Sequence, residues 1–256
     1  AGNISIAFAY VTDITDNENR SAGLGKVSAG LGLGFMTGPA IGGLLAGNDV
    51  ANANYILVAL SGAGINLIAM LATIFFLKES LPVVDRRPFG SVLNLFEKGT
   101  FSPEKTIFPL IICGLIFYTA MSLMEAIFPL WSNSIFDYGP TNIGTVFFVL
   151  GFIGVVIQGG LIGPMTQLIG ERKLVQIASL SVALGLILIG LSLDEVTLWI
   201  GLSFYGMGAA IFNPSLSSLI SKRAKPYERG KFLGQYQSAS AMGRIIGPAF
   251  SGVLYA

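Results

Sequence analysis

The sequence contains no histidine and only one cysteine, Cys113, among its 256 residues. Without histidine it cannot form the histidine-dependent catalytic and metal sites of many enzymes, and a single cysteine cannot form an internal disulfide. The carboxylates are scattered along the chain, so no cluster of acid, base, nucleophile or metal ligands can be assembled. We therefore expect a protein that is not an enzyme and that holds neither a metal nor a cofactor.

Charged residues are scarce as well. They make up 11% of the sequence, whereas an ordinary soluble domain has about 25%. Hydrophobic residues make up 53% of the sequence, and the mean hydropathy is +0.72. The net charge of +1 implies no attraction to nucleic acid. Because the apolar residues form runs of membrane-spanning length, we expect a multi-pass integral membrane protein in a lipid bilayer.

Seven apolar runs follow an apolar stub at residues 1–12, and each is long enough for a spanning helix of about 20 residues. They cover residues 21–47, 54–77, 107–135, 141–163, 174–193, 196–220 and 230–256. One long polar connection, residues 78–105, divides the runs into two groups. The sequence therefore predicts an all-α protein.

Lys and Arg occur in every second connection. The basic connections hold Arg20, Lys26, Lys78, Arg86, Arg87, Lys98, Lys105, Arg172, Lys173, Lys222, Arg223, Lys225, Arg229 and Lys231. The connections between them, residues 48–53, 136–140 and 194–195, hold none. Because basic loops stay in the cytoplasm, we expect these loops to be cytoplasmic, in a plasma membrane or a bacterial inner membrane.

The sequence contains an internal repeat. "RSAGLGKVSAGLGLGFMTGPAIGGLLAG" begins at Arg20 and returns as "RGKFLGQYQSASAMGRIIGPAFSGVLYA" at Arg229, an offset of 209 (229 − 20) with no gap. The repeat unit spans six apolar runs, so both copies enter the membrane from the same side. Secondary transporters are often built from such repeats, with the substrate site at the repeat interface near the midplane.

Small residues recur at every fourth position of each copy, which places them on one helix face. They are Gly30, Gly34, Gly38 and Gly42 in the first copy and Ala239, Gly243, Gly247 and Ser251 in the second. Such a face lets two helix backbones approach closely in lipid. We expect a packing face with a kink at Pro39 and Pro248, which either packs only or also acts as a hinge or seal during alternating access.

"GFMTGPAIGG" resembles the antiporter motif of the major facilitator superfamily, G-x(3)-G-P-x(2)-G-G. Every defined position matches, at Gly34, Gly38, Pro39, Gly42 and Gly43. The second copy, "GRIIGPAFSG", departs only at Ser251 and keeps Gly243, Gly247, Pro248 and Gly252. "DITDNENR", "ESLP" and "ERGKFLGQYQSASAMGRIIGP" resemble the drug:proton antiporter branch of this family.

The resemblance covers the whole chain and implies part of a bundle of two pseudo-symmetric six-helix halves. Residues 1–77 would be the end of the N-terminal half (helices 4–6), residues 78–106 the cytoplasmic central loop, and residues 107–256 the C-terminal half (helices 7–11). The chain would then be a fragment that lacks helices 1–3 and 12. The resemblance further implies alternating-access transport of a small molecule in exchange for protons, and we expect a monomer.

The segment "GPMTQLIGERK" resembles the family's cytoplasmic loop motif, G-x(3)-D-R-x-G-R-[KR]-[KR]. Gly163, Gly170, Arg172 and Lys173 fit the motif. Gln167 replaces its aspartate, and Leu168 and Glu171 replace basic residues. We therefore do not expect an ion pair that gates transport at this loop. Four other loop residues are either solvated charges or gate contacts: Asp13, Arg20, Glu228 and Arg229.

Two charged residues, Glu125 and Arg244, lie well inside apolar runs, where a charge is costly and so indicates function. Glu125 is expected to carry a proton, to pair with a cationic substrate, or to pair with Arg244. Arg244 is expected to face the bundle, either for structure or to bind an anionic group. Gln158 and Asn213 are expected to be either ligands or interhelical hydrogen-bonding groups.

The family layout makes residues 107–135 the seventh helix, which lines the transport cavity. Candidate lining residues on this helix and on residues 196–220, which otherwise simply pack, are Phe117, Tyr118, Met121, Phe128, Tyr205 and Phe212. An apolar cavity of this kind suits small amphipathic molecules better than sugars or phosphates. The predicted function is proton-coupled drug efflux. A facilitator or symporter of a small metabolite is the alternative, and a receptor or structural bundle is disfavoured by the repeat.

Overall fold

The computed structural model describes residues 20–77, 106–225 and 228–255, together with Ala7, Tyr10, Val11, Ile14 and Thr15. The helices are α2 (Arg20–Ala46), α3 (Tyr55–Phe76), α5 (Phe108–Phe136), α6 (Pro140–Val156), the π-helical segment η3 (Ile157–Leu161), α7 (Ile162–Ile169), α8 (Glu171–Leu191), α9 (Glu195–Arg223) and α10 (Arg229–Tyr255). These ranges contain no strand, so the predicted all-α class is confirmed. Most of the stub at residues 1–12 and all but Thr106 of the predicted central loop lie outside the described residues.

The helices are long and apolar enough for a membrane protein. Six helical segments of the described part meet that requirement by length and composition: α2, α3, α5, the continuous α6–α7 segment, α8 and α9. Their bounds agree with the apolar runs of the sequence to within a few residues, except at the end of the 141–163 run. The prediction of a multi-pass membrane protein is therefore confirmed.

The prediction that the 141–163 run ends at Gly163 is wrong, because the helix continues to Ile169. Pro164 lacks the N–H that would bond to the carbonyl four residues back. The π-helical turn just before it, in which the Ile162 N–H donates to the Ile157 carbonyl, carries the helix past this position. The helix stops instead at Gly170, whose φ of +82° is a conformation that glycine adopts readily.

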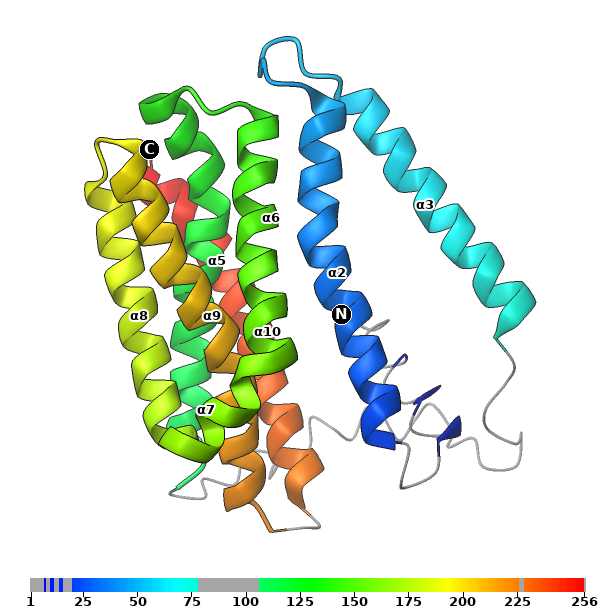
Figure 1. Cartoon of the computed structure of the whole chain (residues 1–256), viewed down its shortest axis with the longest axis vertical. Coiled ribbons are helices and arrows are strands. Elements are labelled where there is room, and N and C mark those ends of the chain that lie inside the picture. The colour runs from blue at the N-terminus through cyan, green and yellow to red at the C-terminus, as the bar shows by residue number, and fades with distance from the viewer. Residues whose placement is uncertain are drawn as a thin grey trace.

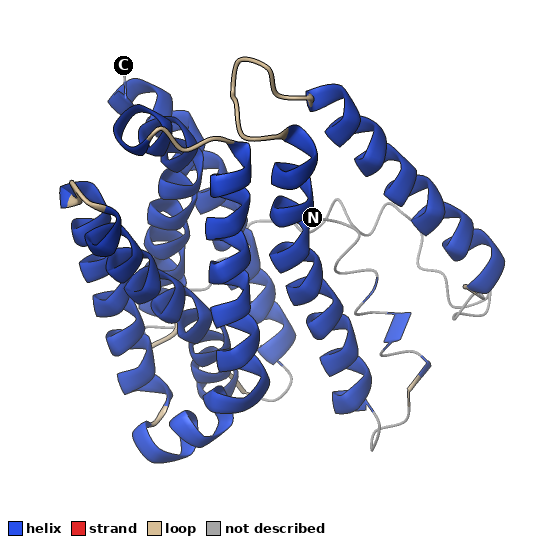
Figure 2. Cartoon of the chain, turned by 45° about the horizontal axis from the view of Figure 1, so that its top comes forward, coloured by secondary structure: helices blue, strands red, loops and turns tan. Residues whose placement is uncertain are grey.

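Helices α5 to α10 form a bundle, and α2 lies alongside α6 (Figure 1). Helix α3 diverges from α2 below the connection that joins them, and it remains apart from the bundle in the turned view of Figure 2. The core lies inside the bundle, where the largest fully buried side chains include Phe128, Leu202, Phe212 and Tyr236. Helix α3, by contrast, has no buried residue.

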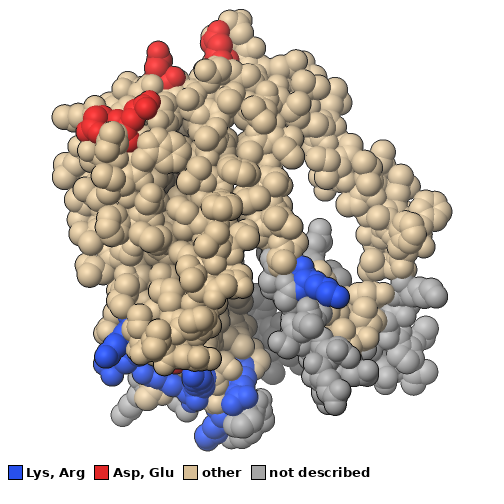
Figure 3. Space-filling model, in the orientation of Figure 1, with Lys and Arg blue, Asp and Glu red and all other residues tan. Residues whose placement is uncertain are grey.

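Charge divides the two ends of the bundle, as the alternation of basic connections predicts. Figure 3 shows carboxylates at the upper end and Lys and Arg at the lower end. The upper connections hold Asp49, Asp137 and Asp194. The helix ends and connections at the other end hold Lys26, Arg172, Lys173, Lys222, Arg223, Lys225, Arg229 and Lys231. The apolar middle between two charged ends is the pattern that a bilayer requires.

The two copies of the repeat form equivalent helices but use different faces. Both α2 and α10 have 27 residues, and their first and last residues keep the offset of the sequence repeat. On α10, a Cβ added to Gly243 would lie 2.7 Å from the Leu115 carbonyl oxygen of α5. On α2, a Cβ added to the equivalent Gly34, or to Gly30 or Gly38, has no described neighbour within 4 Å.

The close contact of α2 is made instead by Gly43 and Pro39, which face α6. A Cβ added to Gly144 of α6 would lie 2.6 Å from the Pro39 carbonyl oxygen and 3.3 Å from the Gly43 Cα. The Thr141 hydroxyl donates to the Gly43 carbonyl at 3.1 Å. Among the described residues, the close contact of the first copy is therefore made by Gly43 and Pro39, and the face of Gly30, Gly34 and Gly38 has no described partner. Because α2 carries small residues on several faces, its packing partner decides which face makes the contact.

We predict that Gly144→Ala destabilises the protein by about 1–3 kcal/mol, because the added methyl meets backbone atoms that no side-chain rotation can move. The matched control is Gly154→Ala on the same helix, where an added Cβ meets nothing within 4 Å. That control should stabilise the protein by about 0.5–1 kcal/mol, since alanine favours a helix interior over glycine. Unfolding in detergent measures both, and two changes of the same sign would contradict the α2–α6 contact.

Candidate functional site

A cavity of about 600 Å³ lies between α2 and α3 on one side and α5 and α6 on the other. Its wall is mostly apolar, with Phe35, Val58, Leu130 and Phe147 among the lining residues. The polar side chains on its wall are Tyr55, Glu125, Asn133 and Tyr138. A concave, mainly apolar cavity with a few polar groups is the usual form of a small-molecule site.

Glu125 is the one charged residue on the wall of this cavity. It lies near the middle of α5 and is partly exposed. Pro129, which follows it by one turn and also lines the cavity, has no N–H to donate to the Glu125 carbonyl. The cavity therefore presents an ionisable carboxyl group beside a backbone carbonyl that lacks its usual helical donor.

Arg244 of α10 lies close to Tyr118 of α5. Its guanidinium carbon is 4.7 Å from the centroid of the Tyr118 ring, a distance at which a cation is attracted to the ring face. Arg244 also attracts the Glu125 carboxylate electrostatically, although no ion pair joins these two described residues. The structure thus places both intramembrane charges in one region without pairing them directly.

The two neutral polar candidates have different surroundings. The Asn213 side-chain oxygen accepts a hydrogen bond from the Tyr236 hydroxyl at 2.8 Å, which joins α9 to α10. Asn213 was expected to be either a ligand or an interhelical hydrogen-bonding group, and this contact is of the second kind. Gln158 lies on η3, is exposed and does not line the cavity.

The aromatic candidates for cavity lining belong to the core instead. Phe117 and Phe212 stack with ring centroids 3.5 Å apart and are 7% and 0% exposed. Tyr118, Phe128 and Tyr205 are also buried, and Met121 packs against the same core. None of the six lines the cavity. Their positions on α5 and α9 turn them toward neighbouring helices, and spacing alone could not distinguish that face from the cavity wall.

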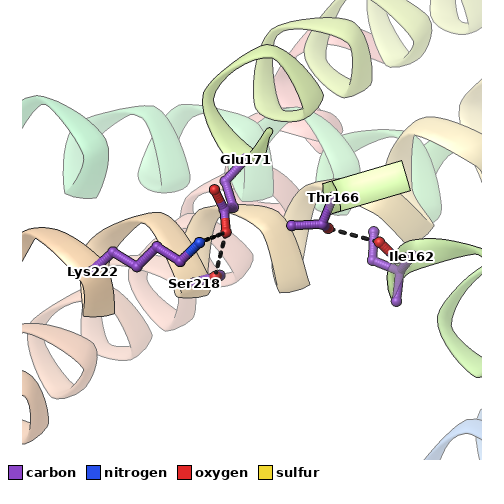
Figure 4. A network of polar contacts seen from close by, with 5 residues as sticks. All are labelled: Ile162, Thr166, Glu171, Ser218 and Lys222. Atoms are coloured by element: carbon purple, nitrogen blue, oxygen red, sulfur yellow. Dashed lines mark hydrogen bonds and ion pairs between the residues drawn. The ribbon is translucent and has the colours of Figure 1, made fainter. Parts of the chain in front are cut away.

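An ion pair joins the segment that resembles the cytoplasmic loop motif to α9, and nothing in its geometry gives it a gating role. Glu171, at the start of α8, pairs with Lys222 near the end of α9, and the Ser218 hydroxyl donates to the same carboxylate at 3.2 Å (Figure 4). Glu171 replaces a basic residue of the motif, and its acidic side chain pairs with a basic residue on another helix. Exposure of Lys222, at 65%, limits such a pair to at most about 1 kcal/mol.

The remaining loop candidates lie at the basic end of the bundle. Gly163 is inside α7, Gly170 separates α7 from α8, and Arg172 and Lys173 are exposed on the first turn of α8. Glu228 and Arg229 lie at the start of α10. Asp13 and the side chain of Arg20 lie outside the described part of the chain, and the structure brings none of the described loop candidates to the cavity.

Tyr138 is a cavity residue that the sequence did not indicate. It lies in the turn between α5 and α6 and is 5% exposed. Burial and the nearby Glu195 carboxylate raise the pKa of its hydroxyl, so Tyr138 is neutral at physiological pH. The turn "DYGP" predicts a helix connection, but nothing in it says that the tyrosine ring points inward.

Comparison with known proteins finds one family whose similarity extends over nearly the whole chain. A family model of the Major Facilitator Superfamily matches residues 1–248. Multidrug resistance protein 2 of Bacillus subtilis (strain 168) is 28% identical, over 99% of this chain and 64% of the relative. The class C tetracycline resistance protein of Escherichia coli is 26% identical, over 98% of this chain and 62% of the relative.

A solved structure, that of the human organic anion transporter MFSD10, matches with a TM-score of 0.63 at 24% sequence identity. The match covers 96% of this chain and 61% of that protein, and at this identity it establishes the fold. The chain thus spans between 61% and 64% of the length of these three relatives.

We predict that Phe212→Ala destabilises the protein by about 3–5 kcal/mol, the usual cost of removing a fully buried aromatic ring. The control is Phe152→Ala, a residue that is 53% exposed and should change stability by less than about 1 kcal/mol. Unfolding midpoints measure both variants. A Phe212→Ala protein of unchanged stability but weakened substrate binding would instead support the cavity-lining role.

Proposed function

Because the chain belongs to the major facilitator superfamily, we propose that it forms part of a secondary transporter that exports small amphipathic molecules in exchange for protons. Glu125 carries this proposal. It is the one charged residue on the wall of an apolar cavity that lies between helices of the two predicted halves. A carboxyl group in that position can hold either a proton or the cationic group of a substrate.

The chemistry of the cavity wall supports the substrate class. Its aromatic and aliphatic side chains provide apolar contact, and Tyr55, Asn133 and Tyr138 provide a few hydrogen-bonding groups. Sugars and phosphates need denser arrays of polar groups or more charge. The Bacillus and Escherichia relatives are named for multidrug and tetracycline resistance. These names agree with export of drug-like molecules.

The position of the cavity suggests the order of events. Asn133, Tyr138 and Val50 lie near the connections at the carboxylate-bearing end of the bundle, opposite the basic end that we propose to be cytoplasmic. Substrate leaves through that end, and a proton from the same side occupies Glu125. After the cavity reorients toward the cytoplasm, the proton is released and the carboxylate is free for the next substrate.

We predict that Glu125→Gln abolishes substrate-driven proton movement, since the amide cannot exchange a proton. The full-length protein is placed in inside-out vesicles with an acidic interior, and a panel of lipophilic cations, neutral drugs and sugars is added while interior pH is recorded. A transported drug should discharge the gradient with the native protein and at least tenfold more slowly with Glu125→Gln.

The matched control is Asp194→Asn, which also neutralises a carboxylate. Asp194 is exposed and caps α9 by accepting from the Thr197 N–H at 2.9 Å, a role that asparagine fills equally well. Its discharge rate should equal that of the native protein. Equal discharge by native protein and Glu125→Gln would remove Glu125 from the proton path, and no discharge by any compound would favour the facilitator or symporter.

A further inference from the structure

The hydroxyl group of Tyr205 is an unexplained polar group in the core of the bundle. Tyr205 is 2% exposed, and its hydroxyl oxygen is buried without a hydrogen-bond partner among the described residues. A buried hydroxyl that forms no hydrogen bond loses the interaction that it would make with water. A phenylalanine would avoid that loss, so the hydroxyl needs a partner that the described residues do not provide.

The backbone at Tyr205 is held firmly in place. Gly185 of α8 lies so close that an added Cβ would be 2.6 Å from the Tyr205 nitrogen and 2.9 Å from its Cα. On the other side, a Cβ added to the adjacent Gly206 would lie 2.9 Å from Leu150 of α6. Because α9 packs closely between α8 and α6 here, the backbone that carries the Tyr205 ring is held in one position.

Tyr205 and Glu125 lie at a similar depth in the bundle. Glu125 is just past the middle of α5, which rises from the basic end, and Tyr205 is just before the middle of α9, which descends from the acidic end (Figure 1). Helices α5 and α9 are in contact. The Glu125 carboxylate also interacts electrostatically with the Tyr205 hydroxyl, as expected of two groups at one depth on contacting helices.

Few other groups compete for this role. The ionisable groups around Glu125 are Arg244 of α10, which attracts it from a distance, and Tyr55 and Tyr138 on the cavity wall. The residues that α2 and α6 contribute to the wall are apolar or glycine. Tyr205 differs from these groups because its hydroxyl is buried in the core, away from the cavity wall, and has no partner among the described residues.

We propose that Tyr205 is a positioning residue for Glu125, and that its O–H donates a hydrogen bond to the Glu125 carboxyl group, directly or through one water, during transport. This inference rests on the proposed function, because it gives Tyr205 a role in proton exchange at Glu125. The bond holds the carboxyl group on the inner wall of the cavity while substrate and proton exchange there. It also satisfies the hydroxyl that is otherwise left unpaired.

The test compares Tyr205→Phe with Tyr236→Phe in the full-length protein. Tyr236 is a second buried tyrosine, fully buried, but its hydroxyl already donates to Asn213. Substrate-induced infrared difference spectra report the C=O stretch of the protonated Glu125 carboxyl group, which Glu125→Gln identifies by removing it. Substrate-driven proton movement is measured on the same samples in the vesicle assay.

With Tyr205→Phe, the Glu125 C=O band should move to higher frequency and proton movement should slow about tenfold, the effect of losing a hydrogen bond to an ionisable group. Thermal stability should not fall, because no bond of the described structure is lost. Tyr236→Phe should show the reverse, with lower stability and an unmoved band. This double contrast separates a positioning role from a general packing role.

An unmoved band and native proton movement in Tyr205→Phe, with movement still lost in Glu125→Gln, would overturn the inference and leave the proposed function intact. Native proton movement in Glu125→Gln would overturn the proposed function, and the inference with it. A band that moves equally in Tyr205→Phe and Tyr236→Phe would also overturn the inference, because the shift would then reflect disturbed packing.

Discussion

The close approach of α2 to α6 is the constraint on which the candidate site depends. Gly43 and Pro39 on one helix and Gly144 on the other leave no room for side chains between the two backbones. In lipid, where apolar side chains gain little from mutual burial, such contact between small residues is what holds helices together. The contact places α2 and α3 beside the bundle, and their side chains with those of α5 and α6 form the cavity.

The chemistry of the cavity follows from one residue placed against an apolar wall. Glu125 lies on the same helix as core residues such as Phe117 and Phe128, but its own side chain is on the cavity face. Arg244 attracts its charge but is exposed and does not pair with it among the described residues. A partly buried acid that is not locked in an ion pair can change its protonation state at modest cost. Proton-coupled transport needs a group of that kind.

Sequence reasoning was most accurate for the helices, because they follow from local chemistry. A run of about 20 apolar residues must be helical to satisfy its backbone in lipid, and the helix bounds agree closely with the runs. Glu125 stood out because a charge in such a run is rare. Reasoning failed at Gly163, where a π-helical turn carried the helix on. It also gave no indication that Glu171 would pair with Lys222, because that partner lies on another helix.

The sequence by itself determined the all-α membrane class, the repeat of α2 in α10, the separation of charge between the two ends and the family. Each of these depends on residue type and spacing along one helix. Tertiary structure alone decided that α2 uses the face of Gly43 rather than that of Gly34, that Phe212 and Tyr205 lie in the core, and that Tyr138 lines the cavity. The physical reason is that a helix with apolar or small residues on several faces can pack in several ways. Only the neighbouring helix selects the face that is buried.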